Sequence, residues 1–161
     1  MIVMVIGGTR SGKSEVAESM ARELGEPVTV IVPAVVVDDE HAARIDVHRR
    51  RRPDSWPTVE CGARLVEAVE GAEGTVLIDS LGTWVTVTPG LEVESARLVA
   101  ALRGRAASTV LVTEEVGLSV HPTSDAGRQF VDTLGALNVE IASCADDVHL
   151  VVAGRTLRLE P

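Results

Sequence analysis

Residues 7–14 read Gly7-Gly8-Thr9-Arg10-Ser11-Gly12-Lys13-Ser14 and fit the pattern G-x-x-x-x-G-K-[ST] at every fixed position. An apolar run from Ile2 to Ile6 precedes this stretch, and Lys13 to Leu24 follows with helically spaced apolar residues. Such a glycine-rich turn points backbone N–H groups and a helix N-terminus at an anion. The stretch therefore predicts a phosphate-binding loop, with Lys13 on the β- and γ-phosphates and the Ser14 hydroxyl on Mg²⁺. It does not distinguish a kinase, a hydrolase, a transferase or a switch.

Short apolar runs alternate with helical segments along the rest of the chain. Strands are expected at 28–32, 75–79, 109–113 and 148–152, and helices at 38–52, 63–69 and 93–106. Another helix carries an apolar stripe and has Ser124 or Asp125 as its cap; the stripe is Phe130, Leu134, Leu137 and Ile141. The turn Ala153-Gly154 leads into Arg155 to Leu159, which predicts a closing hairpin with one antiparallel edge strand.

This order of elements predicts an α/β fold with a mostly parallel sheet flanked by helices and a C-terminal antiparallel hairpin. Together with the phosphate loop it indicates a RecA-like P-loop NTPase, expected as one domain over residues 1–161. The core must be aliphatic, because Phe130, Trp56 and Trp84 are the only aromatic residues among Phe, Trp and Tyr.

The composition limits the partners. With 15 Lys and Arg against 24 Asp and Glu, the formal net charge is −9, which argues against general nucleic-acid binding. Positive charge is instead concentrated at 49–52, where it suits a small anionic ligand. No apolar run has the length of a membrane span. Cys61 and Cys144 are expected to be free thiols in a reducing compartment, and the expected location is the cytoplasm.

Three further residues are candidates for chemistry. Asp79 ends an apolar strand and would bind Mg²⁺ as the second acidic element of the site, although strand-end aspartates also cap turns. His48 precedes four arginines; a neutral imidazole can attack phosphorus, and the arginines could stabilise the transferred group. Residue types alone nevertheless favour a solvated basic helix end with a bystander histidine. His121, in a loop before Pro122, is the third candidate because it could lie near a site, whereas His149 is expected to pack within a strand.

Several stretches in order along the chain resemble the bifunctional adenosylcobinamide kinase/adenosylcobinamide-phosphate guanylyltransferases of cobalamin biosynthesis. The loop is similar to their G-G-[AT]-R-S-G-K-S, and residues 38–52 to their D-D-E-x-A-x-R-I-x-x-H-R-x-x-R. Residues 52–60 resemble R-P-x-x-W-x-T-x-E, and 76–84 resemble V-L-[IV]-D-x-L-x-x-W. Residues 115–138 follow E-V-G…P…R-x-F-x-D-x-x-G-x-x-N, and the final hairpin resembles L-V-V-A-G-x-x-L-x-L. The resemblance covers nearly the whole chain.

The resemblance implies two reactions. A nucleoside triphosphate, ATP or GTP, phosphorylates adenosylcobinamide, and GTP then guanylylates His48, which passes GMP to adenosylcobinamide phosphate to give adenosylcobinamide-GDP. The implied partners are Mg²⁺, these nucleotides, a corrinoid and other copies of the chain in a trimer or hexamer. The implied nucleotide contacts are Gly7, Gly8, Thr9, Arg10, Ser11, Gly12, Lys13, Ser14, Val32, Pro33, Ala34, Arg49, Arg50, Arg51, Arg52 and Glu60.

The chain departs from this pattern in three places. Many relatives have an A-T pair near Val32-Pro33-Ala34, and relatives often read N-E-V-G where this chain has Glu114-Glu115-Val116-Gly117. The stretch between Trp84 and Val93 is also short. The departures bear on the kinase half more than on nucleotide binding. Two other functions are considered: a P-loop kinase of another small hydroxyl substrate without guanylyl transfer, and a non-catalytic GTP-binding switch.

Overall fold

The structure is a computed structural model that describes residues 1–34 and 52–161. Its strands form one seven-stranded sheet in the order β3-β2-β4-β5-β1-β6-β7. Every neighbouring pair is parallel except β6 and β7, so the mostly parallel sheet and the closing antiparallel hairpin are confirmed. The strands are β1 (Ile2–Gly7), β2 (Val28–Val32), β3 (Thr58–Glu60), β4 (Thr75–Asp79), β5 (Thr109–Glu114), β6 (Asp147–Val152) and β7 (Arg155–Leu159).

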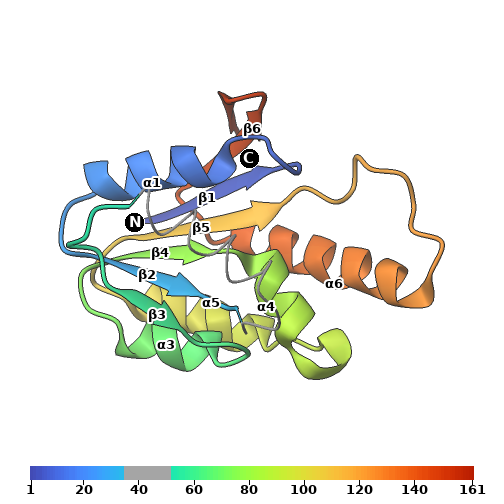
Figure 1. Ribbon diagram of the computed structural model, residues 1–161, viewed down its shortest axis with the longest axis horizontal. Helices are drawn as coiled ribbons and strands as arrows, with labels where there is room; N and C mark the ends of the chain where they lie inside the picture. The colour runs from blue at the N-terminus through green and yellow to red at the C-terminus, as the bar shows by residue number, and fades with distance from the viewer. Residues whose placement is uncertain (35–51) are drawn as a thin grey trace.

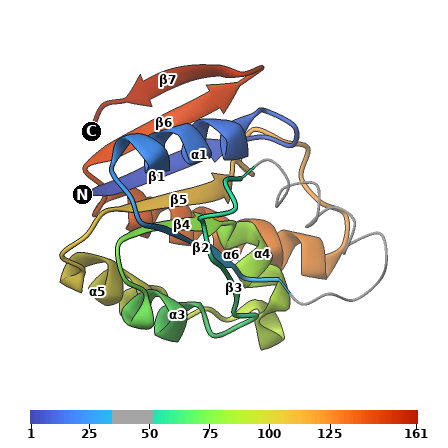
Figure 2. The ribbon, with the colours of Figure 1, turned by 60° about the vertical axis from the view of Figure 1, so that its left-hand side comes forward.

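Helices cover both faces of the sheet (Figures 1 and 2). One face carries α1 (Lys13–Glu23), whose fully buried Ala17 and Ala21 pack on the valines of the sheet. The other face carries α3 (Leu65–Gly71), α4 (Leu81–Val87), α5 (Ser95–Gly104) and α6 (Asp125–Ala142) over a core of leucine, isoleucine and Trp84. The core is aliphatic as expected, and none of the described helices is both long and apolar enough to cross a membrane.

Most elements fall where the sequence predicts them, with three exceptions, one of which is the short 3₁₀ helix η1 (Pro89–Leu91). The sequence did not predict α4, whose residues 82–86 include β-branched Thr83, Val85 and Thr86. Its helix forms because Ser80 caps it, with the hydroxyl accepting from the Thr83 N–H, and because Leu81, Trp84 and Val85 are buried. The short strand β3 was also missed. The helix predicted at 38–52 lies outside the described residues, apart from Arg52.

The bounds of two predicted helices shift: α3 spans Leu65–Gly71 rather than 63–69, and α5 spans Ser95–Gly104 rather than 93–106. The prediction for α6 is confirmed: Leu134, Leu137 and Ile141 are buried, and the Ser124 hydroxyl accepts from the Gly127 N–H at 3.1 Å. Both cysteines are free thiols. Burial raises the pKa of Cys61 to about 11.

Gly74 is a point where the fold requires glycine. Its φ is +67°, and a Cβ there would lie 2.9 Å from the Pro27 Cγ and against the Pro27 carbonyl oxygen. That carbonyl accepts from Thr75 at 2.9 Å and joins the starts of β2 and β4. We expect Gly74→Ala to lower the free energy of unfolding by about 1–3 kcal/mol, because left-handed backbone and overpacking both cost free energy in alanine.

The control for this prediction is Gly104→Ala in α5, where a Cβ would meet nothing within 4 Å. Alanine is the better helix former there, so Gly104→Ala should be neutral or stabilising in the same urea titration. Equal unfolding midpoints for the two variants would contradict the strained conformation assigned to Gly74.

Candidate nucleotide-binding site

The phosphate loop joins the end of β1 to the start of α1, and two glycines set its shape. Gly12 has φ +93°, which favours glycine and lets the chain turn into the helix. A Cβ at Gly7 would lie 2.6 Å from both the Ser11 hydroxyl and the Val151 carbonyl oxygen, so only glycine fits there. The Ser11 N–H donates to the Gly8 carbonyl at 3.2 Å. The loop therefore closes around the N-terminus of an 11-residue helix, the arrangement that binds phosphate.

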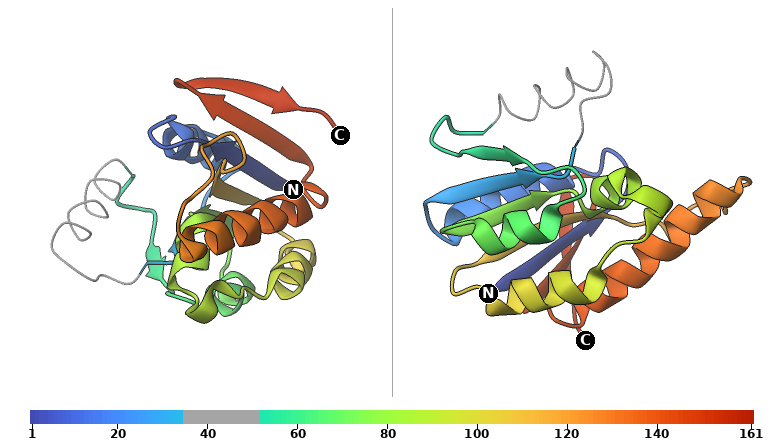
Figure 3. Two further views of the ribbon diagram at one scale, coloured as in Figure 1. Left: turned by 90° about the vertical axis from the view of Figure 1, so that its right-hand side faces the viewer. Right: turned by 90° about the horizontal axis from the view of Figure 1, so that it is seen from below.

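The C-terminal hairpin supports this loop from one side. In its turn, Ala153 and Gly154 have φ of +51° and +71°, and the Gly154 N–H donates to the Ser11 carbonyl at 2.8 Å. A Cβ on Gly12 would lie 3.4 Å from the Gly154 Cα, so the two backbones are in close approach. Figure 3 shows the hairpin in red at one edge of the molecule. The turn that the sequence predicted thus also orients the phosphate loop.

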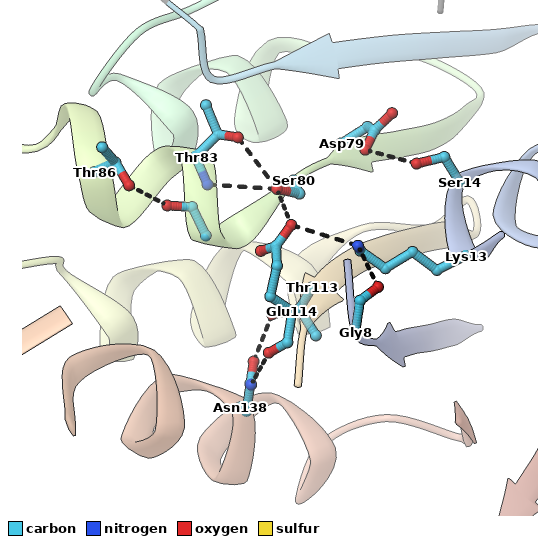
Figure 4. Close-up of polar contacts among 11 residues, drawn as sticks. Gly8, Lys13, Ser14, Asp79, Ser80, Thr83, Thr86, Thr113, Glu114 and Asn138 are labelled. Carbon is cyan, nitrogen blue, oxygen red and sulfur yellow. Dashed lines mark hydrogen bonds and ion pairs between the residues drawn. The ribbon is translucent and has the colours of Figure 1, made fainter. Parts of the chain in front are cut away.

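Lys13 lies over the loop with its side chain 12% exposed. Its Nζ donates to the Gly8 carbonyl at 3.3 Å and lies 3.8 Å from Oε1 of Glu114, the last residue of β5 (Figure 4). A flexible ammonium in this position can serve as a point charge for a phosphate in the loop.

Ser14 and Asp79 meet beside the loop. The Ser14 hydroxyl donates to Asp79 Oδ1 at 3.4 Å, which brings the two predicted metal ligands together (Figure 4). A hydroxyl and a carboxylate are the hard oxygen donors that Mg²⁺ prefers, and Mg²⁺ needs only one or two carboxylates when phosphates supply further oxygens. The donor set therefore fits Mg²⁺. No group of three or more His, Cys, Asp or Glu that could hold a metal occurs within 1–34 and 52–161.

Arg52 fixes the orientation of Asp79. Its Nη2 donates to Asp79 Oδ2 at 2.7 Å and its Nε donates to Glu18 Oε1 at 3.0 Å, and the Arg52 side chain is only 4% exposed. With Oδ2 bound to Arg52, Oδ1 faces Ser14. Arg52 was predicted as a nucleotide contact; the structure places it under the site in a buried ion-pair cluster, and a contact with nucleotide stays a prediction.

A polar network surrounds Glu114. The Ser80 hydroxyl donates to Glu114 Oε1 at 3.0 Å, and the Ser80 hydroxyl also accepts from the Thr83 N–H at the start of α4. The amide of Asn138 in α6 donates to the Glu114 carbonyl at 3.0 Å and accepts from the Thr113 hydroxyl at 2.6 Å (Figure 4). The sequence marked Glu114 only as a departure from relatives. Glu114 lies at the end of an apolar strand, and the same pattern made Asp79 a candidate in the sequence.

The remaining predicted residues lie in different places. Val32 and Glu60 pair at the ends of β2 and β3, with Val32 and Ala34 buried and Glu60 exposed. Strands β4 and β5 separate β2 from β1, so these residues lie along the same carboxyl edge as the phosphate loop but not beside it. His48, Arg49, Arg50 and Arg51 lie outside the described residues. His149 is within β6 as expected, with its Nδ1 buried.

Comparisons with known proteins cover almost the whole chain. A family model described as CobU, cobinamide kinase / cobinamide phosphate guanyltransferase, matches residues 3–159. The bifunctional adenosylcobalamin biosynthesis protein CobU of Escherichia coli K12 is 34% identical over 182 residues, covering 99% of this chain and 100% of that protein. The corresponding CobP of Pseudomonas aeruginosa is 34% identical over 166 residues, covering 98% and 96%.

A solved structure supports the fold. The flagellar accessory protein FlaH of Methanocaldococcus jannaschii aligns with a TM-score of 0.56 at 11% identity, covering 96% of this chain and 74% of that one. At this identity the likeness bears on the fold alone.

Proposed function

The chain belongs to the cobinamide kinase / cobinamide phosphate guanyltransferase family, and we propose that it catalyses both of the reactions that this family name describes. In the first, a nucleoside triphosphate phosphorylates the hydroxyl of adenosylcobinamide. In the second, GMP passes from GTP to adenosylcobinamide phosphate and gives adenosylcobinamide-GDP. The proposal rests on one observation. A complete phosphate loop with its Lys13 and the Ser14–Asp79 pair lie together at one edge of the sheet.

For the kinase step, the loop N–H groups and the N-terminus of α1 bind the phosphates, and Lys13 offsets the charge on the transferred phosphoryl group. The Ser14 hydroxyl and the Asp79 carboxylate would hold Mg²⁺, which when bound neutralises charge on the phosphate oxygens. Arg52 keeps Asp79 turned toward Ser14. Positioning and electrostatics supply most of the catalysis in such transfers, so few side chains are needed.

For the guanylyl step, we propose that the His48 imidazole attacks the α-phosphorus of GTP and displaces pyrophosphate. A phosphate oxygen of adenosylcobinamide phosphate then attacks the same phosphorus and frees the imidazole. Arg49, Arg50 and Arg51 follow His48 and would stabilise the charge that develops on the transferred group. Val32, Pro33, Ala34, Arg52 and Glu60 complete the proposed nucleotide contacts.

The proposal is tested by incubating the protein with adenosylcobinamide, MgCl₂ and either ATP or GTP, and measuring corrinoid masses over time. We expect a phosphorylated corrinoid with a suitable triphosphate, followed by adenosylcobinamide-GDP when GTP is present. Phosphorylated product without the GDP product would indicate a kinase alone. GTP binding with no product at all would indicate a switch.

A further inference from the structure

Glu114 occupies the strand end between the phosphate loop and the metal-binding carboxylate. Strand β5 lies between β1 and β4, and in the parallel register Glu114 aligns with Gly7, the first residue of the loop. Asp79 aligns with Val112 on the other side of the same strand. The Glu114 side chain therefore lies next to Lys13, on the side of the sheet edge where the phosphate loop lies (Figure 4).

The two oxygens of this carboxylate have different surroundings. Oε1 accepts from the Ser80 hydroxyl at 3.0 Å and lies 3.8 Å from the Lys13 ammonium. Oε2 is buried and has no hydrogen-bond partner among residues 1–34 and 52–161; it packs against Gly82, where a Cβ would lie 2.9 Å from the Glu114 Cδ. A buried carboxylate oxygen without a donor costs free energy, so a carboxylate in this place calls for an explanation beyond packing.

We propose that Glu114 is the general base of the kinase step, an inference that rests on the kinase activity proposed above. Lys13 contacts the γ-phosphate in such sites, so a carboxylate oxygen 3.8 Å from its ammonium lies next to the phosphoryl group to be transferred. The attacking hydroxyl must approach that phosphorus to about 3–3.5 Å. It therefore comes within reach of Oε1, which can accept its proton as an aspartate does in protein kinases.

Phosphoryl transfer to the corrinoid needs no reactant besides the hydroxyl substrate, the nucleoside triphosphate and Glu114. Glu114 Oε1 takes the proton of the corrinoid hydroxyl, the hydroxyl oxygen forms a bond to the γ-phosphorus, and the bond from that phosphorus to the bridging oxygen breaks. The nucleoside diphosphate leaves with the bonding electrons. The protonated Glu114 then returns its proton to solvent, which its partly exposed side chain permits.

Neighbouring carboxylates have other contacts. Both oxygens of Glu115 accept backbone N–H groups, from Gly117 at 2.8 Å and Leu118 at 2.9 Å. Asp79 and Glu18 bind Arg52. An asparagine in place of Glu114 could orient a hydroxyl but could not accept its proton, so the proposed role requires the carboxylate that this chain carries.

The first test is Glu114→Gln, which keeps the shape and removes the basic oxygen. We expect the kinase kcat with adenosylcobinamide and ATP to fall at least about 100-fold, the usual contribution of a general base. ATP affinity should be unchanged or tighter, because a negative charge near Lys13 is lost. Attachment of GMP to the protein from GTP should keep its wild-type yield. Glu140→Gln, an equal charge change on the exposed side of α6, should leave all three quantities unchanged.

A second variant displaces the same carboxylate without altering its charge. Alanine at Gly82 would push its Cβ against Glu114, and alanine in a helix does not by itself destabilise the fold. We expect Gly82→Ala to lower the kinase kcat about 10-fold and the double variant with Glu114→Gln to be no slower than Glu114→Gln alone, since both changes act on one group.

These measurements distinguish a protein without kinase activity from an active kinase in which Glu114 is not the base. Wild-type protein that makes no phosphorylated corrinoid would refute the kinase activity itself. If the wild type is active and Glu114→Gln keeps its kcat, Glu114 is not the base. A Glu114→Gln variant that loses ATP affinity in parallel with rate would also overturn the inference, because Glu114 would then only position Lys13.

Discussion

Replacing Lys13 with glutamine is expected to reduce kinase kcat/KM about 100- to 1000-fold, the usual cost of losing one group that stabilises transition-state charge. Lys13 is the cation of the phosphate loop, and its ammonium already lies over the loop at the Gly8 carbonyl. Glutamine has a similar length but no charge. Initial rates of corrinoid phosphorylation measure the loss directly.

The same variant should lose most of the thermal stabilisation that Mg-GTP gives the wild type, because a ligand stabilises the folded state in proportion to its affinity. Arg103→Gln is the matched control: it removes one positive charge from the exposed surface of α5. It should keep both the rate and the thermal shift. A Lys13→Gln protein that is folded and as active as Arg103→Gln would remove Lys13 from the site.

Replacing Arg52 with methionine is expected to lower the free energy of unfolding by about 3–5 kcal/mol, as measured when one partner of a buried ion pair is removed. The Arg52 guanidinium is 4% exposed and binds Glu18 of α1 and Asp79 of β4. Methionine fills much of the volume but leaves the two carboxylates without that cation. Urea unfolding at neutral pH, with the m-value compared between variants, measures the change.

Arg97→Met provides the control for Arg52. Arg97 also contacts two carboxylates, Glu94 at 2.7 Å and Glu67 at 3.4 Å, but its side chain is 49% exposed. Solvent screens such pairs, so the loss of stability should be much smaller than at Arg52. Similar losses at the two positions would mean that burial does not strengthen the Arg52 cluster.

Local patterns predicted most of the fold. Strands such as Val28–Val32 and Thr75–Asp79 were found at their observed bounds, because continuous apolar runs mark strands covered on both faces. The element α4 was missed because its residues 81–87 favour strand by propensity and form a helix only through the Ser80 cap and the burial of Trp84. The strand β3 was missed because three partly exposed residues carry no apolar period.

In the candidate site, too, only residues marked by a local sequence pattern could be predicted. The positions of Lys13 and Ser14 in the phosphate loop could be predicted from one motif, and the nearness of Asp79 from the end of its strand; their roles in binding stay predictions. The cluster of Arg52 with Glu18 joins residues 34 apart, and the contact of Glu114 with Ser80 also joins residues 34 apart. Such pairs depend on how strands and helices pack, which no local pattern contains.

Transfer of GMP through His48 can be tested directly by labelling the protein with GTP. The protein is incubated with Mg²⁺ and GTP labelled at the α-phosphate, then denatured, and its intact mass and bound label are determined with His48→Ala alongside. We predict a gain of one GMP that is lost in acid and is absent from His48→Ala, while Mg-GTP binding persists in both. No adduct on a wild-type protein that binds GTP, or an equal adduct on His48→Ala, would show that GMP is not transferred through His48.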